Sequence, residues 1–153
     1  MLTTTAAGRT WSFSHAIGRR DGSGKGFLCP TAVATAGGGV IYVLSRGVET
    51  ISGVFADKIV KLTMSEELIC EFGGGDGLPG SSQNVWAAGL ALDSRGNVYC
   101  SDEHRNRISI FDGSGCPLGE WGEAGGDLGQ LNGPSGLAVD SGDNLYIVDC
   151  FND

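Results

Sequence analysis

Short runs of apolar residues, separated by turn-forming residues, recur along the chain and determine its predicted secondary structure. Alternating side chains suited to β-strands occur at 90–92, 98–100 and 108–111. The 27 glycines fall in clusters between such runs, which is the spacing of many short strands joined by tight turns. No window of a dozen residues combines helical apolar spacing with helix caps. We therefore predict an all-β chain.

The second half of the chain contains an internal repeat. Residues 89–93 (GLALD) return as residues 136–140 (GLAVD), and residues 97–99 (NVY) return as residues 144–146 (NLY). Both matches are displaced by 47 positions. Two independent matches at one displacement indicate a repeat architecture, which decides the whole fold.

An earlier and more divergent copy precedes these two. Tyr42 aligns with Tyr99 at a displacement of 57, and residues 58–62 align with residues 107–111 at a displacement of 49. The difference between the two displacements is an eight-residue insertion within 46–57.

Each repeat has the size and turns of a propeller blade. In the complete middle copy, four strand-sized pieces lie at 89–93, 97–102, 107–112 and 117–122. The turns between successive pieces are rich in Asp, Gly, Ser and Asn, which suit tight hairpins. Four antiparallel strands per repeat form a β-propeller blade, and neighbouring blades must stack to bury their apolar faces.

These motifs resemble the NHL repeat. The resemblance is strongest from 136 to 152, and the middle copy follows it with Asp102 and the closing Trp121-Gly122. The middle copy departs at Arg105, where the family pattern has Asn, and the first copy departs at Ser45, where it has Asp. The resemblance implies a six-bladed propeller. No Trp is followed by Asp, so the WD40 repeat fits worse.

The repeat register gives the expected domain organisation. We expect an N-terminal tail over 1–9 and an NHL-type propeller segment over 10–153. Within that segment we expect the last strand of a preceding blade and then three blades, the first carrying the insertion and the third truncated, at 10–17, 30–73, 87–122 and 134–153. Six blades of roughly 45 residues need on the order of 270 residues. We therefore expect an incomplete propeller, completed by further sequence or by a second chain.

Composition narrows the possible partners. The net charge is −8, which disfavours a general affinity for nucleic acid or for anionic lipid surfaces. The longest apolar runs are far shorter than the roughly 20 residues that cross a bilayer, and no signal peptide is visible. A membrane partner is not expected, and a cytoplasmic location is slightly favoured although the compartment stays unknown.

No motif predicts catalysis, a metal or another cofactor. The five cysteines are widely spaced, and the two histidines, His15 and His104, are not paired. The stretch 22–26 resembles a phosphate-binding loop but has Gly where Ser or Thr should follow Lys25. Asp102 and Asp149 occupy equivalent repeat positions, which favours turn-capping carboxylates over metal ligands.

Candidate binding residues lie in the loops, where propellers carry function. The insertion contributes the apolar Ile51 and Phe55, which either anchor a partner or fold back over the first blade. The remaining candidates belong to connections at blade ends: Arg46, Trp86, His104 and Arg105.

Three functions remain open. A binding or scaffold module for a protein or another ligand comes first. A metal-dependent propeller enzyme, similar to the amidating lyases or the calcium-dependent lactonases, comes second, and a cluster of three or more carboxylates and histidines would favour it. An RNA-binding NHL domain comes third, because it needs a basic face that outweighs the acidic total.

Overall fold

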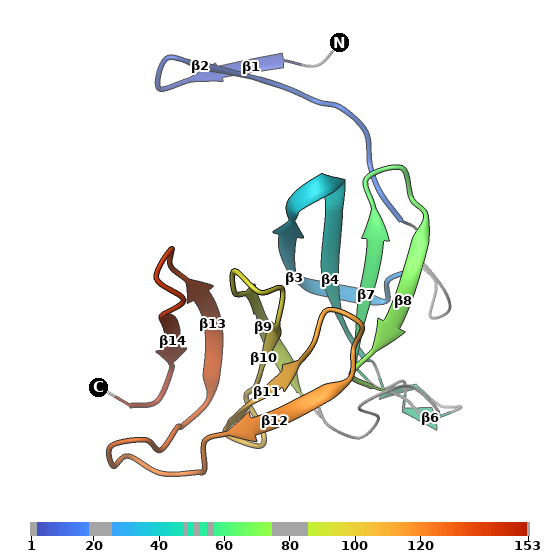
Figure 1. Ribbon diagram of the computed structural model, residues 1–153. Helices are drawn as coiled ribbons and strands as arrows, with labels where there is room; N and C mark the ends of the chain where they lie inside the picture. The colour runs from blue at the N-terminus through green and yellow to red at the C-terminus, as the bar shows by residue number, and fades with distance from the viewer. Residues whose placement is uncertain are drawn as a thin grey trace.

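The computed structural model describes residues 3–18, 26–47, 49–50, 53–54, 57–74 and 86–152. Within these ranges the chain is built from antiparallel β-strands, and its one helical piece is the 3-10 turn Gly37–Gly39. Two four-stranded sheets and a further strand pair follow one another along the chain (Figure 1). The predicted all-β architecture of four-stranded antiparallel propeller blades, incomplete in this chain, is confirmed.

Blade 1 comprises β3 (Cys29–Ala36), β4 (Val40–Arg46), β7 (Lys58–Thr63) and β8 (Leu68–Phe72). Each strand pairs antiparallel with the next, so the sheet is a simple meander. A small hairpin of β5 (Glu49–Thr50) and β6 (Gly53–Val54) interrupts the connection between β4 and β7.

Blade 2 repeats the meander, and blade 3 begins it again. Blade 2 comprises β9 (Ala87–Leu92), β10 (Val98–Asp102), β11 (Arg107–Phe111) and β12 (Pro117–Trp121). Blade 3 comprises the pair β13 (Pro134–Val139) and β14 (Leu145–Asp149).

The turns of the meander are fixed by aspartates at equivalent positions. The Asp93 carboxylate accepts hydrogen bonds from the backbone N–H groups of Arg95 and Asn97, at 3.0 and 2.8 Å. The Asp140 carboxylate accepts from Gly142 and Asn144 in the same way, at 2.8 and 3.0 Å. Because a short Asp side chain can hold its own turn, the local sequence is enough to place these hairpins.

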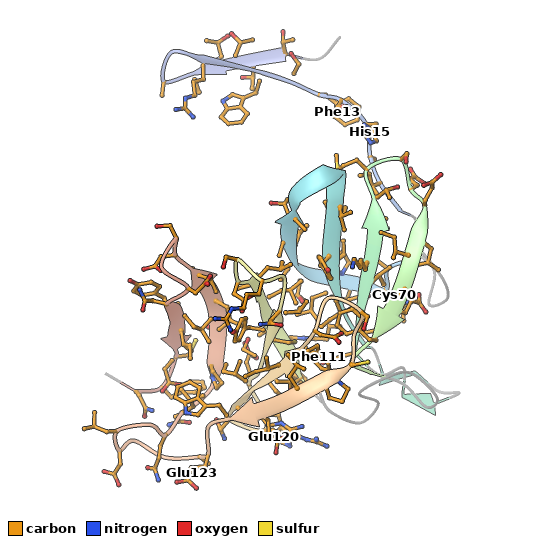
Figure 2. The ribbon with its side chains drawn as sticks, in the orientation of Figure 1. Phe13, His15, Cys70, Phe111, Glu120 and Glu123 are labelled. Atoms are coloured by element: carbon orange, nitrogen blue, oxygen red, sulfur yellow. The ribbon has the colours of Figure 1, made fainter. Side chains whose placement is uncertain are left out.

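Blades 1 and 2 pack face to face through an apolar core. Tyr42, Leu44 and Phe72 of blade 1 meet Leu90 and Phe111 of blade 2 in one buried cluster. The Phe72 and Phe111 ring centroids are 5.3 Å apart, and Phe111 lies between the two sheets (Figure 2). This stacking gives each small sheet the buried face that it cannot form alone.

Blades 2 and 3 approach more closely. The Ser101 hydroxyl of β10 donates to the Ser135 carbonyl oxygen of β13 at 2.6 Å, and it accepts from the Gly89 N–H at 2.8 Å. A Cβ at Gly89 would lie 2.0 Å from the same Ser135 oxygen. Only glycine therefore fits at position 89 with the two blades at this separation.

The N-terminal part differs from the expected tail over 1–9 and single strand over 10–17. Strand β1 (Thr3–Ala6) pairs with β2 (Arg9–Ser12) in a hairpin that stands away from the blades (Figure 1). Ala7 and Gly8 both have positive φ, 49° and 73°, which is the backbone of a two-residue hairpin turn.

An extended segment joins this hairpin to blade 1. Phe13 and His15 lie along the segment (Figure 2), and His15 Nε2 donates to the Met64 carbonyl oxygen at 3.0 Å. The segment ends at Ile17, which packs with Phe27 against the side of blade 1 that faces away from blade 2.

Candidate functional site

One end of the blades gathers the insertion, the blade-to-blade connections and the loops between second and third strands. In blade 2 the register pairs Asp102 with Ala87 and with Arg107, so the start of β9, the end of β10 and the start of β11 lie together. In blade 1 the register likewise pairs Ser45 with Lys58 at the boundary of the insertion. We call this end the loop face.

Arg46 and Trp86 meet on the loop face at the junction of blades 1 and 2. The Arg46 guanidinium carbon lies 5.1 Å from the centroid of the Trp86 ring. Arg46 Nε donates to the Ala87 carbonyl oxygen at 3.1 Å, and a terminal nitrogen lies 3.7 Å from a Glu103 carboxylate oxygen. Trp86 is 50% exposed, and the Arg46 guanidinium, which these contacts hold in place, lies against the face of its ring.

Asp57 links the insertion to the next blade. Its carboxylate is buried and accepts hydrogen bonds from the Gly47 N–H at 2.7 Å and from the Ala87 N–H. Burial raises the pKa of Asp57, against the two hydrogen bonds and the Arg46 charge, which lower it. Sequence reasoning singled out the apolar residues of the insertion and missed Asp57; the available signal was a carboxylate directly before a strand.

His104 and Arg105 occupy the turn that follows β10. Both are exposed, and their backbone N–H groups donate to the Asp102 carboxylate at 3.1 and 3.0 Å. Asp149, at the equivalent position of blade 3, accepts instead from the Asn132 N–H in the connection before β13, at 2.7 Å, and from the Asn152 side-chain amide, at 2.6 Å. Asp102 thus caps the turn that follows β10, as predicted, whereas the backbone group that Asp149 holds belongs to the connection before β13.

The structure brings together some of the predicted binding residues. Arg46 and Trp86 touch although they are far apart in sequence, and Glu103 joins them to the turn that carries His104 and Arg105. Ile51 and Phe55 lie outside the described residues, as do positions 22–25 of the phosphate-loop-like stretch.

Two features of the described residues bear on the metal-enzyme and membrane alternatives. Nowhere in the part of the chain that the structure describes do three or more His, Cys, Asp or Glu side chains gather as a metal site would require. Over the same residues, no helix is long and apolar enough to span a membrane.

Among known proteins, the chain is similar to solved structures of one enzyme. No protein-family model and no curated protein matches the sequence. A catalytically inactive virginiamycin B lyase from Staphylococcus aureus with quinupristin has a TM-score of 0.45 and 15% identity, over 79% of this chain and 49% of that chain. The selenomethionine-substituted virginiamycin B lyase from Staphylococcus aureus has a TM-score of 0.37 and 13% identity, over 88% of this chain and 66% of that chain. The blade assignment stands on the sheets and their stacking, not on these likenesses.

Proposed function

We propose that this chain is part of an NHL-type propeller whose loop face binds a protein partner, with Trp86 as the anchor. The observation that carries the proposal is the half-exposed Trp86 ring held on Arg46. The turns that Asp93 and Asp140 hold at the same place in two repeats support the NHL assignment.

Trp86 has the properties of a binding hot spot. A large aromatic side chain buries much apolar area while immobilising few torsions, and Trp and Arg dominate the energetics of protein interfaces. Arg46 is already fixed by the Ala87 carbonyl oxygen and by Glu103, so the pair loses little freedom when a partner covers it.

The electrostatics of the junction favour a protein over RNA. Arg46 lies beside Glu103 and close to the buried Asp57, so the positive charge under Trp86 is largely balanced. Binding to a phosphate backbone needs uncompensated cations, whereas an apolar side chain of a protein partner needs only the ring. We therefore expect the partner to present an apolar or aromatic side chain to Trp86.

Selection from a random-peptide phage library on the wild-type chain tests this proposal. Peptides that bind should lose at least about thirtyfold in affinity on Trp86→Ala and on Arg46→Ala, the loss typical of a hot spot. Trp121→Ala is the matched control, because Trp121 is 46% exposed but lies on the outermost strand of blade 2; it should change affinity less than about threefold. Equal losses on Trp86→Ala and Trp121→Ala, or no loss on Trp86→Ala, would contradict the proposal.

A further inference from the structure

Trp86 and Glu103 approach Arg46 together on the loop face. The Glu103 N–H donates to the Trp86 carbonyl oxygen at 3.1 Å, which extends the antiparallel pairing of β9 with β10 by one residue. Residues directly opposite one another in such a pair place their side chains on the same side of the sheet. Both side chains accordingly reach Arg46 at the end of β4. An aromatic ring, a cation and an anion therefore lie side by side at the junction of blades 1 and 2.

Arg46 and Glu103 are neighbours, but they leave hydrogen-bonding capacity unused. A terminal nitrogen of Arg46 lies 3.7 Å from a Glu103 carboxylate oxygen, which is beyond the reach of a hydrogen bond. Among the residues that the structure describes, Arg46 donates only through Nε, and the Glu103 carboxylate accepts no hydrogen bond. The two side chains are 25% and 36% exposed. The donors and acceptors of this pair are thus accessible to a partner.

The charges around Trp86 decide which polar group of a partner fits. A carboxylate that approached Arg46 would lie beside the Glu103 carboxylate, and the buried Asp57 places a second acidic group near Arg46. An ammonium or guanidinium group that approached Glu103 would lie beside the Arg46 cation in the same way. Like charges at such short separations reduce affinity in both cases. A neutral group that carries an acceptor and a donor side by side meets no such repulsion.

A primary carboxamide is a group of this kind. Its carbonyl oxygen accepts, its NH2 group donates, and both are attached to one carbon atom. It can therefore accept from Arg46 and donate to Glu103 at the same time. A backbone peptide group cannot, because its carbonyl oxygen and its N–H point in opposite directions in the trans form. The side chains of Asn and Gln are the ones in a protein that carry a primary carboxamide.

We propose that the loop face recognises an Asn or Gln side chain of its protein partner, beside the apolar side chain that covers Trp86. The carboxamide oxygen accepts from the terminal nitrogens of Arg46, and the carboxamide nitrogen donates to the Glu103 carboxylate. This inference rests on the proposed function, because Trp86 anchors the same partner. Contact with the ring supplies affinity, and the Arg46–Glu103 pair selects a neutral polar side chain over a charged one.

Synthetic peptides made from the sequences of the phage selection test the proposal. Peptides whose binding depends on Trp86 should carry Gln or Asn beside an apolar or aromatic residue. Replacing that Gln by Glu keeps the shape and adds a charge, so it should weaken binding to the wild-type chain by about tenfold or more. Replacing it by Leu should weaken binding by about fivefold or more, because Arg46 and Glu103 would then lose water without gaining a partner.

The variant Glu103→Gln should reduce the preference for Gln over Glu. Without the Glu103 charge, a carboxylate can accept from Arg46 without repulsion, so the affinity of the Gln peptide relative to the Glu peptide should fall by about tenfold or more. Both peptides are measured on the same variant, so a change in the fraction of folded chain cancels from this ratio.

Glu67→Gln is the matched control for the change of charge. Glu67 is exposed in the connection between β7 and β8, at the end of blade 1 opposite the loop face. Because solvent and salt screen a charge at that distance, this variant should keep the affinity ratio within about threefold of the wild-type value.

The outcomes distinguish a failure of this inference from a failure of the loop-face proposal. Trp86-dependent peptides that carry a charged residue, or no polar residue, beside the apolar anchor would overturn the carboxamide inference alone. An unchanged affinity ratio in Glu103→Gln, or an equal fall in Glu67→Gln, would also overturn it alone. If no selected peptide depends on Trp86, the loop-face proposal fails and this inference fails with it.

Discussion

Gly89 tests how closely blades 2 and 3 approach one another. In Gly89→Ala the new Cβ would lie 2.0 Å from the Ser135 backbone oxygen, and ordinary contacts begin at 3.4 Å. The two innermost strands must therefore separate by roughly 1 Å or more, because a backbone oxygen cannot rotate aside as a side chain does.

The loss of stability in Gly89→Ala can be estimated from the interactions that this separation disturbs. Overpacking a close contact costs about 1–3 kcal/mol. The Ser101 hydroxyl would also lose its 2.6 Å hydrogen bond to the Ser135 oxygen, at about 1 kcal/mol. We expect Gly89→Ala to lower the free energy of unfolding by about 2–4 kcal/mol.

Urea unfolding followed by circular dichroism measures this loss, with Gly119→Ala as the control. Gly119 also lies in a strand of blade 2, but a Cβ there would meet nothing within 4 Å. The control should change stability by less than about 0.5 kcal/mol. If both variants unfold at the same urea concentration, β9 and β13 do not pack as described and the blade-stacking argument fails.

Three further predictions concern ionisable groups. Because burial raises the pKa of Asp57, the folded chain binds the Asp57 proton more tightly than the unfolded chain does. The contribution of Asp57 to stability therefore falls as pH rises through that pKa. The difference in unfolding free energy between wild type and Asp57→Asn should shrink from about pH 3 to about pH 7. Hydrogen bonds from the Asn144 side chain and from backbone N–H groups lower the pKa of Asp140 to about 2. Carboxyl NMR should show that value in the wild type and a value closer to 3.8 in Asn144→Ala. The stability that these hydrogen bonds give the folded chain is present above the ordinary pKa of Asp and disappears as pH falls through about 2. Burial raises the pKa of the Cys100 thiol, and nearby carboxylates raise it further. Cys100 should therefore resist a thiol reagent at about pH 8 until the chain unfolds. The exposed cysteines should react in the native state: Cys29, Cys116 and Cys150. Each prediction has an outcome that would contradict it. For Cys100 it is rapid labelling in the native state, and for Asp140 it is an unchanged pKa in Asn144→Ala. For Asp57 it is a stability difference between wild type and Asp57→Asn that does not change with pH.

Much of the fold was predictable because it is local and periodic. The turn at Asp93 is held by hydrogen bonds within five residues, and alternation along a strand decides which side chains face a neighbouring blade. The N-terminal hairpin escaped prediction because its strands are rich in Thr and Ala and its Ala-Gly turn lacks the usual Asn or Asp. The site was only partly predictable. Arg46 and Trp86 were candidates because they lie in predicted loops, but no sequence pattern indicated that the two side chains are in contact.

The sequence by itself determined the all-β repeat, the four strands of each blade and the aspartates that hold the turns, since these depend on backbone preferences and on hydrogen bonds between near neighbours. Only the tertiary structure decided that Arg46 supports Trp86 and Glu103 approaches both. It also decided that the buried Asp57 ties blade 1 to blade 2. The physical reason is that these contacts cross between blades, so they depend on how far one sheet is displaced and rotated against the next, which no short stretch of sequence encodes.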